Sequence, residues 1–131
     1  MVEETKPEEG GRATRVLVVE DESIISMSLG GQLRALGCEV VGAARDAAGA
    51  IEMARRLRPD VVLMDLGLAG QNGVEAIRAI MEEAPTRVIV ITAYGDDRVR
   101  RAREAGARLV LTKPVLVEQL AVAIKQVMAA G

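Results

Sequence analysis

Several residues with the chemistry to bind a metal ion or a phosphate stand where apolar runs of this chain end. They are Glu20, Asp21, Asp65, Thr92 and Lys113. Clustered carboxylates repel one another, and a hard divalent cation with oxygen ligands relieves that repulsion. If the fold brings the three acids together, Mg²⁺ is the expected occupant. Asp65 ends an apolar run with β-branched residues, where a buried strand of an open α/β sheet would meet a ligand crevice.

The composition excludes several other kinds of chemistry. The 131 residues include no histidine, which removes Ser-His-Asp and Cys-His catalysis, histidine metal sites and a histidine phosphotransfer role. The one cysteine, Cys38, can form neither an internal disulfide nor a thiolate metal cage. We therefore expect a reducing, cytoplasmic compartment and a buried, inert thiol.

Charge and hydropathy argue against nucleic acid and membrane partners. The net charge is −2, but residues 1–14 hold four glutamates against two basic residues, which leaves 15 acidic and 15 basic residues in the remainder. This balanced body, with one tyrosine as its sole aromatic residue, offers neither a basic surface nor stacking platforms. No unbroken apolar stretch approaches the roughly 20 residues that a membrane span requires.

Apolar and amphipathic segments alternate from residue 15 onward. We expect residues 1–14 to be a flexible tail and residues 15–131 to form one domain. The expected strands are residues 16–19, 39–43, 61–65, 87–91 and 109–111. The expected helices are residues 23–36, 46–58, 72–83 and 96–105, and a last one with Leu120, Ile124 and Val127 buried. The alternation predicts an α/β fold, a flavodoxin-like (βα)5 three-layer sandwich with a parallel five-stranded sheet in the order 2-1-3-4-5.

Local signals mark some of the helix ends. Ser23 and Asp46 are candidate N-caps, and Gly37 can supply the turn that ends the first helix. Gly30 and Gly31 interrupt that helix, where each costs roughly 1 kcal/mol relative to alanine. We expect this pair to pack closely against a neighbouring element.

The predicted strand order gathers the polar residues at one place. The order reverses between the first and third strands, and a crevice opens at the carboxyl ends of strands at such a point. Glu20, Asp21 and Asp65 follow these two strands, and Thr92 and Lys113 follow the fourth and fifth. We therefore expect all five to share one crevice.

Four short motifs contain these residues. They are Val18-Val19-Glu20-Asp21-Glu22, Leu63-Met64-Asp65-Leu66, Ile91-Thr92-Ala93-Tyr94-Gly95 and Leu111-Thr112-Lys113-Pro114. Taken singly, such residues are usually helix caps, strand residues or surface lysines. In this order and spacing they resemble the receiver domain, the phosphoacceptor module of two-component response regulators. The resemblance extends from residue 15 to the last helix and favours a stand-alone receiver of the chemotaxis-regulator kind.

The resemblance implies a magnesium site and a phosphoacceptor. By the family's pattern, Asp21 and Asp65 bind Mg²⁺ directly, Glu20 binds it through water, and Gly67 through its backbone carbonyl. Asp65 would be the nucleophile that accepts a phosphoryl group, with Lys113 contacting the phosphate and offsetting its charge. The chain would then be a signalling domain and not an enzyme, apart from Mg²⁺-dependent phosphorylation and dephosphorylation of itself.

The resemblance also implies a switch and partners. Thr92 would turn toward the phosphate, with Ala93 small enough to permit the movement, and so shift the face of the fourth helix, fifth strand and fifth helix. The phosphate donor would be a sensor histidine kinase or a histidine phosphotransfer protein. A downstream protein would bind the shifted face, where the candidate contacts are Arg98, Arg100, Arg101 and Arg103. We expect a monomer, or a weak dimer that forms on phosphorylation.

Four positions depart from the family's usual pattern: Glu20, Ala69, Val110 and Val115, the last of which replaces a common phenylalanine. Glu20 replaces an aspartate but keeps its charge, and Ala69 replaces a proline in a loop that should be mobile without metal. Val110 replaces an aromatic residue whose ring moves with Thr92, so coupling to the output face should be weaker or differently built. Tyr94 could shield the phosphoacceptor from water or be an ordinary exposed loop residue.

Two other functions fit part of the pattern. One is a phospho-independent binding module that has kept the acids but lost the switch. The other is a metal-dependent phosphohydrolase with an aspartyl nucleophile, although Gly67 stands where a second aspartate would act as general acid. The chain could also be the receiver fragment of a larger regulator.

Overall fold

The computed structural model describes residues 12–68, 73–93 and 95–129. Our predictions for the tail up to residue 11, for Ala69 and for Tyr94 lie outside the described residues. The described part contains five strands and five helices in alternation. In chain order they are β1 Arg15–Val19, α1 Ser23–Ala35, β2 Glu39–Ala44, α2 Ala47–Leu57, β3 Val61–Asp65, α3 Gly73–Glu83, β4 Arg87–Thr92, α4 Val99–Ala105, β5 Leu109–Thr112 and α5 Val117–Ala129.

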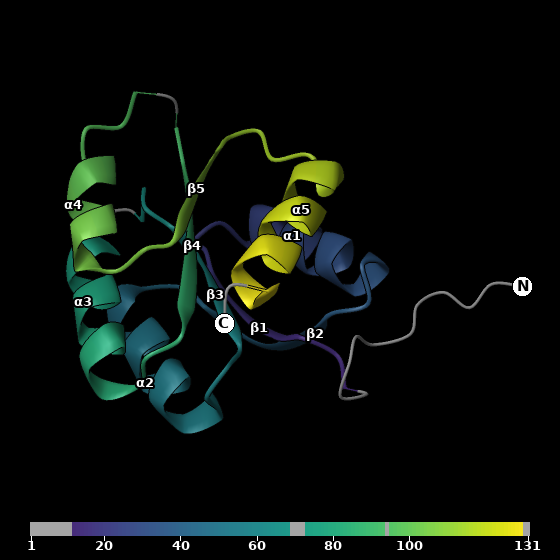
Figure 1. Ribbon diagram of the computed structural model, residues 1–131, viewed down its shortest axis with the longest axis horizontal. Coiled ribbons are helices and arrows are strands. Elements are labelled where there is room, and N and C mark those ends of the chain that lie inside the picture. The colour runs from purple at the N-terminus through teal and green to yellow at the C-terminus, as the bar shows by residue number, and fades with distance from the viewer. Residues whose placement is uncertain (1–11, 69–72, 94, 130–131) are drawn as a thin grey trace, which may run out of the picture.

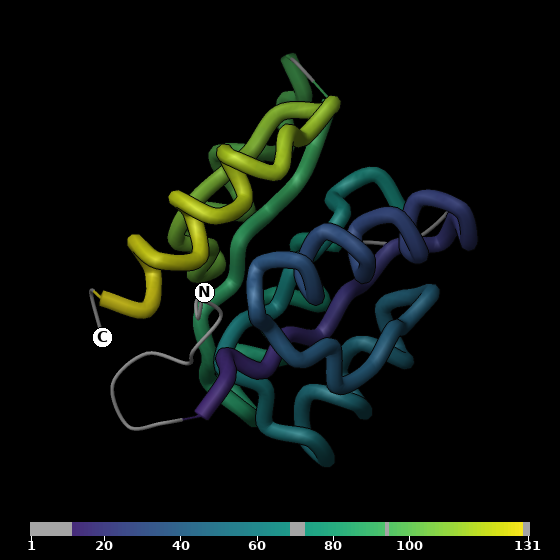
Figure 2. Tube along the Cα trace, turned by 90° about the vertical axis from the view of Figure 1, so that its right-hand side faces the viewer, coloured from purple at the N-terminus to yellow at the C-terminus, as the bar shows by residue number. Residues whose placement is uncertain are grey.

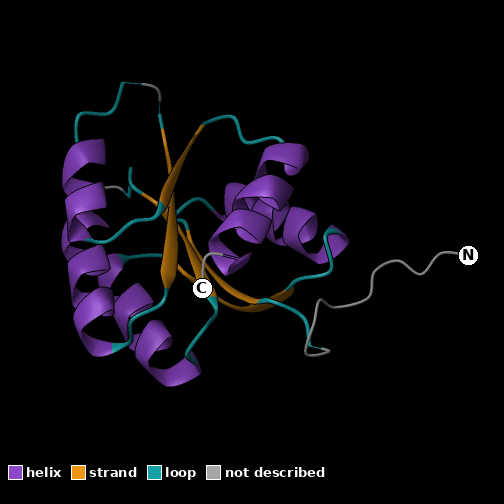
Figure 3. Ribbon diagram, viewed as in Figure 1, coloured by secondary structure: helices purple, strands orange, loops and turns teal. Residues whose placement is uncertain are grey.

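All five strands of the described chain are parallel and form one sheet in the order β2-β1-β3-β4-β5. Helices α2, α3 and α4 cover one face, and α1 and α5 cover the other (Figures 1 and 3). Figure 2 looks onto the second face, with α1 and α5 in front of the strands. The predicted three-layer fold and strand order are confirmed. The carboxyl ends of β1, β3, β4 and β5 therefore meet at one edge of the sheet.

The core consists of two aliphatic layers, one on each face of the sheet. Strand β3 is buried along its whole length, and its residues alternate between the layers. Val62 and Met64 pack with the residues of α2, α3 and α4, whereas Val61 and Leu63 pack with those of α1 and α5. The same alternation determines toward which face of the sheet each polar side chain at a strand end points.

The ends of the helices agree in part with the sequence signals. Asp46 is the N-cap of α2, since its Oδ1 accepts a hydrogen bond of 2.7 Å from the Gly49 amide. Gly37 ends α1 with a φ of +86°, as predicted. The prediction for Ser23 is wrong: Ser23 is the first helical residue, and the N-cap is Glu22, which makes no side-chain capping bond. The Glu22 amide instead donates to Glu20 Oε2 over 3.0 Å, so Glu20 fixes the entry to α1.

The expectation for the glycine pair is also wrong. A Cβ at Gly30 would meet only the Arg34 guanidinium of the same helix within 4 Å, and a Cβ at Gly31 would meet nothing. Neither glycine permits the close approach of another element. The structure offers no reason for two glycines in α1.

No helix within the described residues has the length and apolar character that crossing a bilayer would require.

Candidate metal and phosphate site

Backbone hydrogen bonds align the strand ends that carry the polar residues. The Leu66 amide donates to the Ile91 carbonyl over 2.9 Å, and the Lys113 amide donates to the Thr92 carbonyl over the same distance. The ends of β3, β4 and β5 are thereby held in register, next to the end of β1. The expected gathering of the five residues at one edge of the sheet is what the structure shows.

The three acids form a tight cluster. One carboxylate oxygen from each of Glu20, Asp21 and Asp65 lies within 4.8 Å of the others. Glu20 and Asp65 are almost completely buried, with 2% and 3% of their surfaces exposed. Glu20 Oε1 is buried, and none of the residues that the structure describes forms a hydrogen bond with it. A buried, unpaired oxygen among clustered carboxylates fits a cation site, because a cation would satisfy that oxygen and neutralise the cluster.

The electrostatics of the cluster lead to the same conclusion. Burial, reinforced by the adjacent Asp65, raises the pKa of Glu20 to about 7. Ionising this carboxyl in the metal-free protein is therefore unfavourable at neutral pH. Three oxygen donors at this spacing suit Mg²⁺, so Glu20, Asp21 and Asp65 would hold it; that assignment remains a prediction.

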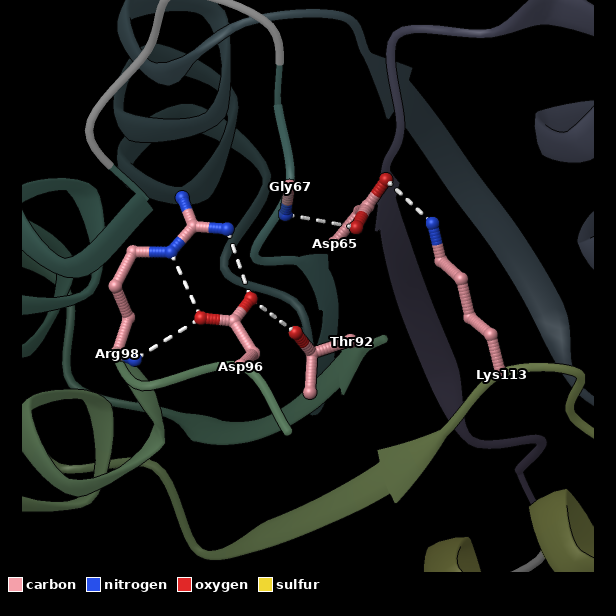
Figure 4. A network of polar contacts seen from close by, with 6 residues as sticks. All are labelled: Asp65, Gly67, Thr92, Asp96, Arg98 and Lys113. Carbon is pink, nitrogen blue, oxygen red and sulfur yellow. Dashed lines mark hydrogen bonds and ion pairs between the residues drawn. The ribbon is translucent and has the colours of Figure 1, made fainter. Parts of the chain in front are cut away.

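Asp65 is held on both sides, by Gly67 and by Lys113 (Figure 4). The Gly67 amide donates to Asp65 Oδ1 over 2.9 Å, and Lys113 Nζ lies 3.2 Å from Asp65 Oδ2. Lys113 thus brings a positive charge directly to this carboxylate, where a transferred phosphate would carry negative charge. The structure assigns the Gly67 amide to this contact, while the role of its carbonyl as a metal ligand stays a prediction.

Thr92 reaches the same edge of the sheet but does not bond to Asp65. Its hydroxyl donates to Asp96 Oδ2 over 2.5 Å. Asp65 follows the alternation of Val61 and Leu63 toward α1 and α5, whereas Thr92 follows Val88 and Val90 toward α3 and α4. Asp65 and the Thr92 hydroxyl therefore start from opposite faces of the sheet.

Asp96 is a site residue that the sequence reasoning missed. Its carboxylate accepts from Thr92 and from Arg98, through the Arg98 backbone amide, Nε and Nη2 at 2.8–2.9 Å (Figure 4). These bonds hold residues 96–98 in a turn, so α4 begins at Val99 and our predicted start at Asp96 is wrong. The available signal was a carboxylate two residues before an arginine, which is typical of a local charge-assisted turn.

Comparison with known families decides the class of the chain. Residues 16–125 match the response regulator receiver domain family. The chain belongs to the response regulator receiver family. The match spans every strand end described above, so the resemblance found in the four motifs is confirmed for the domain as a whole.

Curated relatives of this receiver are response regulators with additional sequence. It is 40% identical over 112 residues to the transcriptional regulatory protein PdtaR of Mycobacterium tuberculosis, covering 85% of this chain and 55% of PdtaR. It is 38% identical over 114 residues to the transcriptional regulatory protein LiaR of Bacillus subtilis, covering 85% of this chain and 54% of LiaR. The receiver spans about half the length of these relatives.

Solved structures share the receiver fold. The response regulator domain of Thermotoga maritima CheB aligns with a TM-score of 0.77 and 34% identity, over 91% of this chain and 96% of that domain. The signal receiver domain of the response regulator NarL from Mycobacterium tuberculosis aligns with a TM-score of 0.84 and 29% identity, over 92% of this chain and 99% of that one.

Val110 and Ala93 complete the description of this receiver. Val110 pairs with Val90 in the sheet and packs, half-buried, into the layer under α2, α3 and α4. It lies on the same face as Thr92 but has no ring to move with it. Ala93 is exposed and lies in the turn that leads to Asp96, where its carbonyl accepts from the Asp96 amide.

Proposed function

We propose that this receiver accepts a phosphoryl group on Asp65 in a Mg²⁺-dependent reaction and signals through protein contacts. The observation that carries the proposal is the position of Asp65. It belongs to an acidic cluster that contains an unpaired buried oxygen of Glu20, and it also contacts the Lys113 ammonium group. In this arrangement, one carboxylate has both a cation site and a fixed positive charge beside it. Phosphoryl transfer requires little more than such positioning and charge compensation.

In the proposed reaction, an Asp65 carboxylate oxygen attacks phosphorus. A new oxygen–phosphorus bond forms as the bond to the donor breaks, and the donor atom leaves with the electron pair. Gly67 orients the carboxylate through its amide, and Lys113 offsets the negative charge on the transferred group. Mg²⁺, when bound by the acids, supplies further positive charge at the phosphate oxygens.

Incubation with acetyl phosphate and Mg²⁺, followed by intact-mass measurement, tests the proposal. One phosphoryl group per chain is the expected result, and EDTA should prevent its addition. No addition under either condition would favour the phospho-independent binding module. Repeated turnover of acetyl phosphate without accumulation of the phosphorylated chain would favour the phosphohydrolase.

The stability of this receiver should depend on Mg²⁺ in a pH-dependent way. Folding raises the pKa of Glu20 to about 7, so the folded metal-free state binds this proton more tightly than the unfolded state does. Stability from the proton is complete below the unfolded pKa of roughly 4.5 and is lost as the pH rises through about 7. Mg²⁺ needs the ionised carboxylate, so it should raise the melting temperature more at about pH 8 than at about pH 5.5.

Thermal melts with Mg²⁺ and with EDTA at both pH values measure this difference. Glu20→Gln is the matched variant, because it keeps the shape of the side chain and removes the titrating proton. Its metal-free form should lose less stability between the two pH values and should gain less from Mg²⁺. An equal Mg²⁺ effect on the wild-type protein at both pH values would contradict the assignment of Glu20 to the cation site.

The phosphoryl donor is proposed to be a histidine kinase or a histidine phosphotransfer protein in the cytoplasm. A groove of about 500 Å³ leads to the site between α1 and the segment after β5, and Glu20 and Lys113 line both the groove and the site. Next in sequence to the lining residues Ile25, Ser28 and Val115, the side chains of Ile24 and Met27 are 82% and 74% exposed, and that of Leu116 is also exposed. Large exposed apolar side chains beside a reactive carboxylate fit a docking surface for the donor protein.

Ile24→Asp and Met27→Asp should each slow phosphotransfer from a kinase that phosphorylates the wild-type chain, by about tenfold or more. Both variants should react normally with acetyl phosphate, because that small donor needs no docking surface. Val122→Asp is the matched control, since Val122 is exposed on α5, and no described residue of α5 lines the groove, whereas α1 contributes several lining residues. If the α1 variants retain full transfer from the kinase, the donor does not dock on this face.

The proposed output face consists of α4, β5 and α5. Arg100, Arg101 and Arg103 are exposed on α4 and suit an acidic partner. Arg98 differs from them, because it precedes the helix and its guanidinium binds Asp96. The four candidate contacts are therefore reduced to the three exposed arginines.

A further inference from the structure

The Thr92 hydroxyl donates to a strong acceptor, Asp96, which is not the proposed phosphoacceptor Asp65. Thr92 is 2% exposed, and its hydroxyl donates to Asp96, whose side chain is also largely buried. Figure 4 shows Asp96 on one side of Thr92, and Asp65 on the other side with its own contacts to Gly67 and Lys113. Within the described chain, none of the hydrogen bonds of Thr92 joins its hydroxyl to Asp65.

Asp96 is itself held firmly in place. Arg98 donates to both of its oxygens, from the backbone amide and from two guanidinium nitrogens. Hydrogen bonding from Arg98, with a smaller contribution from Thr92, holds the pKa of Asp96 well below its usual range. The carboxylate is therefore ionised at every physiological pH and is a constant, charged acceptor for the hydroxyl.

We propose that Asp96, oriented by Arg98, is a positioning residue that holds the Thr92 hydroxyl away from Asp65 until a phosphoryl group displaces it. A threonine hydroxyl has one hydrogen, so it can donate to the Asp96 carboxylate or to a phosphate oxygen, but not strongly to both. The two acceptors therefore compete for the hydroxyl. The stronger the Thr92–Asp96 hydrogen bond, the more it lowers the apparent affinity for a phosphoryl group, because this bond must break when the hydroxyl turns to the phosphate. This inference rests on the proposed function.

The same contact offers a path to the output face. Arg98 is the N-cap of α4, and its backbone amide donates to Asp96. When the Thr92 hydroxyl leaves, Asp96 loses a partner while it stays bound to Arg98, directly at the start of the helix that bears the exposed arginines. The path runs through a turn between β4 and α4 and needs no aromatic ring on β5, where this receiver has Val110.

The proposal is tested by the binding of beryllofluoride, a stable phosphoryl mimic, in the presence of Mg²⁺. Asp96→Ala should bind it about tenfold more tightly than wild type, because the hydroxyl no longer has to leave a charged acceptor. Asp97→Ala removes an exposed acid next to Asp96 and should leave the affinity unchanged. Unchanged affinity in Asp96→Ala would overturn the proposal.

A double-mutant cycle separates this role from a merely structural one. In the Thr92→Ala background there is no hydroxyl to hold, so adding Asp96→Ala should have no effect on beryllofluoride affinity. A tenfold gain in both backgrounds would show that Asp96 acts by another route. If wild type itself fails to bind beryllofluoride with Mg²⁺, both the proposed function and this inference are wrong.

A second measurement uses only the wild-type protein and does not depend on the folding of a variant. The amide resonance of Arg98 reports its hydrogen bond to Asp96, so beryllofluoride should shift it along with the Thr92 resonances. Binding that shifts resonances around Asp65 and leaves those of Thr92 and Arg98 in place would show that the contact is not released.

Discussion

Asp65→Asn is expected to abolish phosphoryl incorporation from acetyl phosphate. The amide that replaces the carboxylate is not a nucleophile of comparable strength and cannot form an acyl phosphate, while the rest of the site stays in place. The side-chain oxygen of asparagine can still accept from one of the two donors, the Gly67 amide or Lys113, so the variant should fold. Intact-mass measurement after incubation with Mg²⁺ and acetyl phosphate is the assay.

Asp60→Asn is the matched control for this variant. Asp60 precedes β3 directly, at the opposite end of the same strand, where its carboxylate pairs with Arg12 and accepts from the Arg15 amide. Its loss should lower stability somewhat and leave phosphorylation intact. A phosphoryl group that still appears on Asp65→Asn would mean that another residue is the acceptor and that the proposed site is misassigned.

Lys113→Ala is expected to slow phosphorylation by about 100-fold, the usual effect of removing one preorganised donor at a developing charge. The loss should be mainly in rate, because Lys113 contacts Asp65 Oδ2 but is not itself one of the acids expected to hold the metal. Mg²⁺ affinity should be equal or greater, since a cation has been removed from beside the cluster. Initial rates with acetyl phosphate and Mg²⁺ titrations followed by melting temperature measure the two effects.

Lys125→Ala provides the comparison for Lys113→Ala. Lys125 is an exposed lysine of α5, far along the chain from the strand ends, and its loss changes the net charge by the same amount. Its phosphorylation rate should equal that of wild type. A wild-type rate in Lys113→Ala would show that the ammonium group contributes nothing to the reaction, which would weaken the case for phosphate contact at this position.

The fold and the acidic part of the site could be predicted from the sequence because both depend on short-range patterns. Apolar runs alternate with amphipathic segments, and the parallel order that follows brings the strand ends together whatever the details of the loops. Asp65 is the last residue of β3, and Glu20 and Lys113 directly follow β1 and β5, so the positions of all three depend on the strand boundaries alone. Lys113 was expected to share a crevice with Asp65, and its Nζ lies 3.2 Å from Asp65 Oδ2, while its contact with a phosphate stays a prediction.

The position of Thr92 was harder to predict because it depends on competition between acceptors. Its rotamer is set by Asp96, which lies in a turn, and Asp96 is in turn fixed by Arg98. An aspartate near the start of a helical pattern ordinarily indicates an N-cap. Here the Asp96 carboxylate binds Thr92 and Arg98 and does not cap the helix. The predicted cap at Ser23 failed for a similar reason, since Glu20 binds the Glu22 amide and ends the loop one residue earlier.

The unpaired Oε1 of Glu20 means that this receiver is frustrated in its metal-free state. Burial of the Glu20 carboxyl raises its pKa to about 7, so its ionised form opposes folding, and a neutral side chain of the same shape would remove that penalty. If the proposed Mg²⁺ site is correct, the folding equilibrium should depend on the concentration of the divalent cation, and depletion of magnesium should lower both phosphorylation and the population of folded receiver.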